Sequence, residues 1–187
     1  MKIEHPSTLE PPELQLEREG SIVQLEREGE IVVECALAFG KDMSWLFGSA
    51  GESNISCWNG VGVENGRITR IDWYDEKLTG RIPEAIGELT ALTYLFLGEN
   101  DLEGEIPSSL GRLKKLRQLN LARNMLTGSI PRSFSNLTSL EELGLYNNYL
   151  HPDAPWYLAG AELKEYLWSL EWRRVPKRKT TSDLCHA

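Results

Sequence analysis

The sequence predicts a short α/β repeat solenoid, in which similar coils of chain stack on one another between two caps. Three observations predict it. Apolar and glycine positions recur every 24 residues over roughly residues 66–150. Within each period, apolar residues alternate over a stretch that suits one short strand. The repeated part has few units, and because no single coil can bury its own apolar face, both ends need covering segments.

The repeat is visible as columns of like residues that are 24 positions apart. The clearest columns hold an Ile-Pro pair and the glycine before it: Ile82-Pro83, Ile106-Pro107 and Ile130-Pro131, with Gly80, Gly104 and Gly128. Upstream, each unit has three apolar residues: Ile68, Ile71 and Trp73; Leu92, Leu95 and Leu97; Leu116, Leu119 and Leu121; Leu140, Leu143 and Leu145. Their spacing predicts a strand whose apolar side chains point into a shared core.

Each remaining column has a physical explanation. Asn100, Asn124 and Asn148 follow the strands, and we expect them to turn inward and bond the main chain of adjacent coils. The glycine permits a tight turn, and the proline suits a segment that leaves the strand. We expect a pair of apolar residues in each unit to pack inward from the convex side: Ile86 and Leu89; Leu110 and Leu113; Phe134 and Leu137.

At these residues the sequence resembles the leucine-rich repeat family, specifically its plant-type class with the pattern LxxLxLxxNxLxGxIPxxLxxLxx. The first unit departs from the pattern at Trp73 and Glu76, and the last breaks off at His151-Pro152. The resemblance implies a short right-handed coil with a parallel sheet on its concave side. It also implies a module that recognises proteins, peptides or glycans.

The chain divides into five predicted parts. They are an acidic N-terminal extension (1–30), an N-terminal cap (31–65), the repeats (66–150), a C-terminal cap helix (151–172) and a basic tail (173–187). The extension contains QLEREGSIV followed at once by QLEREGEIV, a near-duplicate that predicts either a frayed helix or a small hairpin around Gly20. Leu163, Tyr166, Leu167 and Leu170 form one helical stripe, which predicts a cap over the last coil or, alternatively, a docking helix.

The N-terminal cap also resembles the family at CWNGVGVENGRIT, residues 57–69. Secreted relatives usually have a pair of cysteines flanking this segment. Here Cys57 is present and Val63 takes the second position, so we expect no disulfide. We expect a helix ending near Gly40, and a cap core built from Ala36, Leu37, Phe39, Trp45, Leu46 and Phe47.

Composition excludes several classes of function. The net charge of −8 opposes binding to nucleic acid, and no apolar stretch is long enough to insert in a membrane. His5, His151 and His186 are scattered, so we expect no metal, no cofactor and no catalytic site. A carboxylate pair such as Asp72 and Asp75 is better explained as part of a solvated recognition face than as a glycosidase site.

The outward positions of the strands define the predicted binding surface. By the period of two, they carry Arg70, Asp72, Tyr74, Tyr94, Phe96, Gln118, Asn120, Glu142 and Tyr146, with Glu99 at the rim. Tyr74, Tyr94 and Phe96 are expected to form an aromatic cluster that contacts a partner. The alternative is that Tyr94 and Phe96 only shield the sheet edge beside the cap.

These observations predict a non-enzymatic module that binds another protein or peptide on its concave face. We expect the partner to carry basic or apolar groups that complement the acidic rim. The alternatives are a secreted glycan binder or inhibitor of wall-degrading enzymes, and a structural subunit of a larger assembly. The start MKIEHPSTLEPPELQLE lacks the apolar core of a signal, which predicts a cytoplasmic protein, or an extracellular one if a signal is missing. The oligomeric state is not predicted.

Overall fold

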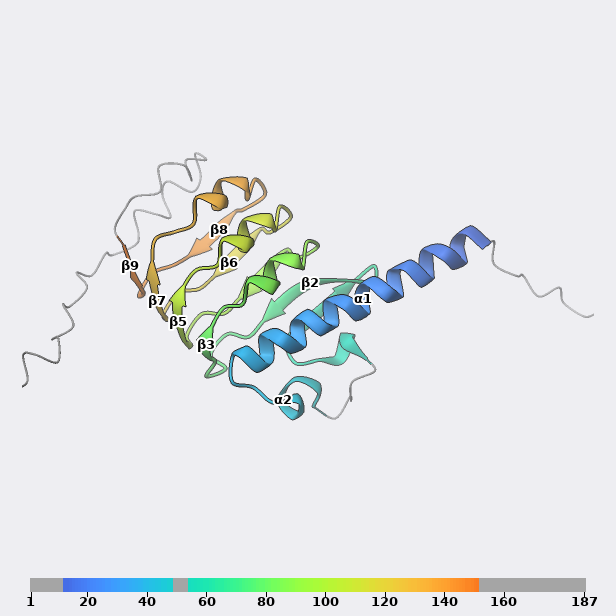
Figure 1. Ribbon diagram of the computed structural model, residues 1–187, viewed down its shortest axis with the longest axis horizontal. Coiled ribbons are helices and arrows are strands. Elements are labelled where there is room, and N and C mark those ends of the chain that lie inside the picture. The colour runs from blue at the N-terminus through green and yellow to red at the C-terminus, as the bar shows by residue number, and fades with distance from the viewer. Residues whose placement is uncertain (1–11, 49–53, 152–187) are drawn as a thin grey trace, which may run out of the picture.

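The computed structural model describes residues 12–48 and 54–151. The predicted C-terminal cap helix, apart from its first residue, and the basic tail lie outside the described residues. The described part begins with the helix α1 (Pro12–Ala38), which is followed by the short helix α2 (Met43–Phe47), the 3-10 turn η1 (Ile55–Cys57) and the strand β1 (Val61–Glu64). Figure 1 shows α1 lying across one end of the stacked coils.

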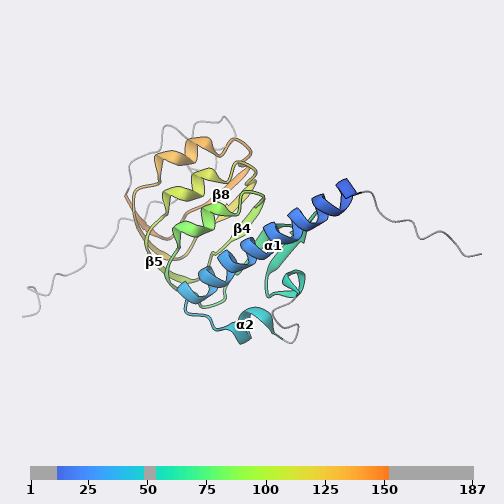
Figure 2. The same ribbon diagram turned by 45° about the vertical axis from the view of Figure 1, so that its right-hand side comes forward.

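The coils place three kinds of element in three rows. The concave sheet has the order β1-β2-β4-β6-β8 and contains β2 (Arg67–Asp72), β4 (Tyr94–Phe96), β6 (Gln118–Asn120) and β8 (Glu142–Gly144). The convex side carries the 3-10 turns η2 (Glu84–Glu88), η3 (Ser108–Arg112) and η4 (Arg132–Asn136). A second sheet has the order β3-β5-β7-β9 and contains β3 (Thr79–Arg81), β5 (Asp101–Glu105), β7 (Met125–Gly128) and β9 (Tyr149–Leu150). The stacking of these rows is visible from two sides (Figure 1 and Figure 2).

The core follows the predicted columns. The inward strand residues are buried, and so are Ile86, Leu110 and Phe134 on the convex side. The parallel pairing places residues 24 positions apart beside each other, as at Leu95 and Leu119. The right period was therefore enough to predict which side chains share the interior.

The asparagine ladder is present between the coils. Asn124 Oδ1 accepts a hydrogen bond from the Leu102 amide at 3.0 Å, and Asn124 Nδ2 donates to the Leu97 carbonyl of the preceding coil at 2.9 Å. Asn100 and Asn148 make the corresponding bonds, each to the coil that precedes its own. Each amide side chain thus satisfies buried main-chain groups where the chain bends.

The second sheet was not predicted from the sequence. Its strands lie between the ladder asparagine and the Ile-Pro pair, where apolar and polar residues do not alternate clearly. Gly80, Gly104 and Gly128 lie in or at the end of these strands with φ between 77° and 80°, a left-handed conformation that favours glycine. Close packing also restricts Gly80, because a Cβ there would approach the Ala38 carbonyl oxygen to 2.5 Å.

The N-terminal duplication is helical, so the hairpin alternative is wrong. Gly20 lies inside α1, which also runs across the expected boundary between extension and cap at residues 30 and 31. Nine residues correspond to two and a half helical turns, so the two copies present the same side chains on opposite sides of the helix. Ile31 and Val32 of the second copy are accordingly buried, whereas Ile22 and Val23 of the first are 56% and 65% exposed.

The prediction of the cap core is wrong at one residue, which is exposed. Leu37 is 54% exposed, while Ala36, Phe39, Leu46 and Phe47 are buried and Trp45 is half-buried. The inward face of α1 passes through Val32, Cys35 and Ala36 and continues to Phe39, just after the helix ends, with spacings of three, one and three residues. This spacing places Leu37 on the opposite side of the helix.

Polar contacts fasten the cap to the first coil. Glu28 is fully buried, pairs with Arg67 at 2.6 Å and accepts a hydrogen bond from the Ile68 amide at 2.8 Å. The two residues by which the first repeat departs from the pattern also face the cap. The Trp73 indole donates to the Asn59 carbonyl at 2.7 Å, and Glu76 accepts from the Trp45 indole at 3.2 Å.

Candidate functional site

The concave sheet brings the predicted binding residues into columns. In the parallel register, Arg70 lies opposite Tyr94, Tyr94 opposite Gln118, and Gln118 opposite Glu142. Asp72, Phe96 and Asn120 form the next column. Adjacent strands in a sheet are about 4.8 Å apart, so these side chains form one continuous surface.

The N-terminal side of this surface is organised around Arg70. Its guanidinium pairs with the Asp72 carboxylate at 2.6 Å and lies over the rings of Tyr94 and Phe96, at 5.5 and 5.1 Å from their centroids. The two ring centroids are 6.2 Å apart. The positive charge is therefore held by one carboxylate and two aromatic faces, an arrangement that restricts the arginine side chain. We call these four residues the Arg70 cluster.

A second cluster connects four successive coils, through residues that follow β2, β4, β6 and β8. The Tyr74 hydroxyl donates to Glu99 at 3.1 Å, Glu99 pairs with Arg123 at 2.5 Å, and the Arg123 guanidinium lies 6.0 Å from the Tyr146 ring centroid. Partial burial and the hydrogen bond to Glu99 raise the pKa of Tyr74. We call these four residues the Arg123 cluster.

This geometry corrects the predicted aromatic cluster. Tyr94 and Phe96 are in contact, but Tyr74 belongs to the Arg123 cluster. The surface also carries a basic residue that was not predicted from the sequence, Arg123. A signal was present, since Asp75, Glu99, Arg123 and Asn147 form a further 24-residue column. All four have φ near 55°.

The sheet edge beside the cap is covered by backbone. Strand β1 pairs antiparallel with β2, with Gly62 opposite Arg70. A Cβ on Gly62 would lie 2.9 Å from the Arg70 Cβ, so the glycine allows close approach at this point. Because β1 covers the edge, shielding it does not account for the Tyr94 and Phe96 rings.

Small residues lower the surface between the two tyrosines of the Arg123 cluster. Gly98 and Ala122 occupy the positions between Tyr74 and Tyr146 and are buried, as is the neighbouring Gly144. Asn120 is engaged locally, since its Oδ1 accepts a hydrogen bond from the Ala122 amide at 3.0 Å. The two tyrosines themselves are 47% and 39% exposed.

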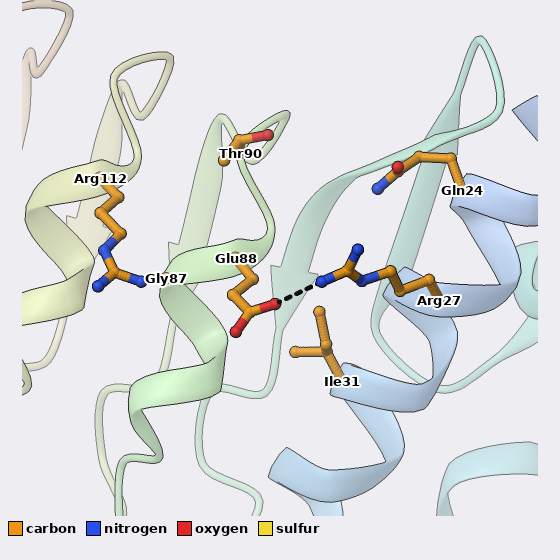
Figure 3. Close-up of a pocket in the computed structure, with 7 residues that line it drawn as sticks. All are labelled: Gln24, Arg27, Ile31, Gly87, Glu88, Thr90 and Arg112. Carbon is orange, nitrogen blue, oxygen red and sulfur yellow. Dashed lines mark hydrogen bonds and ion pairs between the residues drawn. The ribbon is translucent and has the colours of Figure 1, made fainter.

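On the convex side, a cavity of about 270 Å³ lies between α1 and the turns η2 and η3, lined by Gln24, Arg27, Ile31, Gly87, Glu88, Thr90 and Arg112. Figure 3 shows Arg27 reaching Glu88, with which it pairs at 3.4 Å.

Within residues 12–48 and 54–151, no group of three His, Cys, Asp or Glu side chains is placed to hold a metal ion. The helices in the same ranges include none that could span a membrane.

Comparison with known proteins identifies the repeat. The model of the leucine rich repeat family matches residues 90–150. A comparison with curated proteins gives no match.

Solved structures show the same fold. The ectodomain of the receptor kinase SOBIR1 from Arabidopsis thaliana is 30% identical, with a TM-score of 0.56; the match covers 65% of this chain and 66% of SOBIR1. A protein of the BIR3–SERK2 complex from Arabidopsis thaliana is also 30% identical, with a TM-score of 0.53 and coverage of 64% and 69%. A plant ice-binding protein is 28% identical, with a TM-score of 0.60 and coverage of 67% and 41%.

The similar structures can be compared with the predicted location of the protein inside or outside the cell. The SOBIR1 structure is that of a receptor ectodomain, the part of a receptor that lies outside the cell. The comparison therefore agrees with the extracellular alternative rather than with the cytoplasmic prediction. The chain spans just under two thirds of the SOBIR1 structure and less than half of the ice-binding protein.

Proposed function

The chain belongs to the leucine-rich repeat family, and we propose that it is a non-enzymatic module that binds another protein or peptide across its concave sheet. The observation that carries this proposal is the pair of arginine and tyrosine clusters on one continuous surface. Binding energy at protein interfaces is concentrated in tyrosine, tryptophan and arginine residues that are held rigidly and partly desolvated. The Arg70 and Arg123 clusters have this composition.

The partner is expected to be chemically mixed. Acidic and basic side chains alternate on the concave surface, with Arg117 and Glu141 forming a third pair at 2.7 Å. Basic groups of a partner would face Asp72, Asp75 and Glu142, and apolar groups would pack on Tyr74 and Tyr146. Such alternating charges favour one orientation of the partner over others.

A protein partner fits this surface better than a glycan does. A sugar would stack on exposed aromatic faces, but Arg70 already lies over the rings of Tyr94 and Phe96. The BIR3–SERK2 structure is a complex of two proteins, which supports the same choice by analogy. An inhibitor of wall-degrading enzymes would also be a protein binder, so it is a special case of this proposal.

We place the module outside the cell. The two glycosylation sequons start at Asn54 and Asn136, and both asparagines are exposed. Asn136 ends the convex turn η4, so a glycan there would leave the concave sheet free. Enzymatic glycan release from the native protein tests the compartment, because a mass decrease requires passage through the secretory pathway.

The binding proposal is tested by capture of partners from native plant extract, followed by affinity measurements with the captured partner. The first variant replaces Tyr74, Tyr94 and Phe96 by Ala. The control replaces three side chains of the second sheet, Glu103, Met125 and Tyr149, by Ala. We expect the first variant to bind at least about 30-fold more weakly, since a hot-spot residue contributes about 2 kcal/mol or more. Full binding by this variant, or an equal loss in the control, would show that the partner does not use the concave surface.

A further inference from the structure

The side of α1 that faces away from the coils carries both carboxylates and apolar side chains. Ile22, Glu26, Glu30 and Glu34 follow one another at intervals of four residues, which places them along one side of the helix. The three glutamates are exposed, and the neighbouring Val23 and Leu37 are exposed by 65% and 54%. We call these six residues the outer stripe of α1.

Among residues 20–38 of α1, whose side chains the structure describes, Arg27 is the only basic residue. Arg27 turns toward the convex side and pairs with Glu88. Like charges four residues apart on a helix destabilise it by about 0.2 to 0.5 kcal/mol per pair. A basic, partly apolar segment would neutralise the carboxylates and cover the apolar residues at the same time.

The chain itself contains a segment of this chemistry. Residues 172–179 read WRRVPKRK, in which five basic residues accompany Trp172 and Val175. The mixture of apolar and basic residues complements the apolar and acidic residues of the outer stripe. Neither the concave sheet nor the repeats account for this segment.

The segment is long enough to reach α1. The last described strand, β9, is three strand intervals from β3, or about 14 Å. Helix α1 ends at Ala38, and the carbonyl of the next residue, Phe39, accepts a hydrogen bond from the Thr79 amide of β3. A helix is about 10 Å wide. The separation between β9 and this C-terminal end of α1, where the outer stripe ends at Leu37, is thus about 25 Å. From His151 to Arg173 there are 22 residues, which span about 33 Å as a helix and about 73 Å when extended.

We propose that residues 172–179 dock on the outer stripe of α1 in the same molecule. The contact would join the two ends of the solenoid along its outside and leave the concave sheet open. Because the segment is tethered, its effective concentration near α1 is high even when the intrinsic affinity of a few ion pairs is low. The contact should weaken at high ionic strength, since its charges are exposed.

Paramagnetic broadening in the full chain tests the contact. A nitroxide is attached at Cys185, six residues after Lys179, in a Cys57→Ser background. Cys35 stays unlabelled because it is buried. We expect the amide signals of residues 22–37 to be broadened strongly at low salt and to recover at about 1 M salt, where the screening length is about 3 Å.

Two charge reversals provide the matched comparison. One changes Glu26, Glu30 and Glu34 to Lys, and the control changes Asp101, Glu103 and Glu105 of β5 to Lys. Both alter the net charge equally, so only the first should abolish the broadening. Adding Arg173→Glu, Arg174→Glu and Lys177→Glu to the first variant should restore it, which also shows that the variant is folded.

Three results would overturn the proposal. They are an absence of broadening in the parent chain, equal broadening in the two charge-reversed variants, and broadening of an isotope-labelled chain by a separate spin-labelled chain. The last result would mean that the segment binds between molecules. None of these results depends on the concave binding partner, so this proposal can fail while the proposed function holds.

Discussion

Replacement of Asn124 by Ala tests whether the asparagine ladder stabilises the solenoid. Asn124 is 6% exposed, and its loss leaves the Leu102 amide without the acceptor that it has in the structure. A buried unpaired amide costs about 1 to 3 kcal/mol, and each hydrogen bond lost to the carbonyls of Leu97 and Leu121 contributes about 0.5 to 1.5 kcal/mol. The expected loss is therefore about 2 to 6 kcal/mol, a large part of a stability of about 5 to 15 kcal/mol.

Asn148 supplies the matched control for this prediction. Its side chain makes the same kinds of bond, to the Leu126 amide at 3.0 Å and the Leu121 carbonyl at 2.8 Å, but it is only half-buried. Water can replace part of these bonds, so Asn148→Ala should cost less than half as much as Asn124→Ala. Urea unfolding followed by circular dichroism measures both losses. Equal losses, or a loss below about 0.5 kcal/mol for Asn124→Ala, would refute the assigned role of burial in the ladder.

Further predictions concern the duplicated segment, the thiols and a convex carboxylate. Ile31→Ala should cost about 2 to 5 kcal/mol in urea unfolding, while Ile22→Ala, the same change in the other copy, should cost less than about 0.5 kcal/mol. At pH 8, iodoacetamide should modify exposed Cys57 and spare Cys35 until urea is added. The reason is that burial, with a smaller contribution from the neighbouring Glu34, raises the pKa of Cys35 to about 12. Mass spectrometry of the peptides measures the modification, and modification of both Cys35 and Cys57 in the folded protein would contradict this prediction. Hydrogen bonds from η3 lower the pKa of Glu84, so its stabilising effect is present above the unfolded pKa of about 4.3 and is lost as the pH falls. Glu84→Gln should therefore destabilise the protein at pH 7, and its difference from the parent in thermal melts should shrink as the pH falls below the unfolded pKa. A difference that stays constant with pH would contradict this assignment.

The repeat could be predicted from the sequence because the residues that define it recur at a fixed spacing along the chain. A side chain in a stacked coil meets its equivalents one period away, so the identity of one column predicts the contacts of the next. This is why the inward leucines, the asparagine ladder and the concave columns could be placed before the structure was described. The departures at Trp73 and Glu76 also marked the end repeat, where the structure shows contacts with the cap.

The structure of the duplicated N-terminal segment was harder to predict from the sequence, because its pattern allowed either a helix or a hairpin. Its two copies have nearly the same sequence, yet only the second is buried. The second copy is followed by Cys35, Ala36 and Phe39, which continue the buried face, whereas Glu26, Arg27 and Glu30 occupy the equivalent positions after the first. This explains the choice of register once the helix and the coils are placed together.

The sequence by itself determined the period, the inward residues of the repeats and the side chains that the strands present on the concave sheet, since these depend on spacing along the chain. Only the tertiary structure decided how those exposed side chains combine. Glu99 and Arg123 are separated by 24 residues and come from adjacent coils, whereas Arg70 pairs with Asp72 of its own strand. Such pairings depend on distances of a few ångströms between long, rotatable side chains, and these distances are set by the stacking of the coils and not by the order of residues.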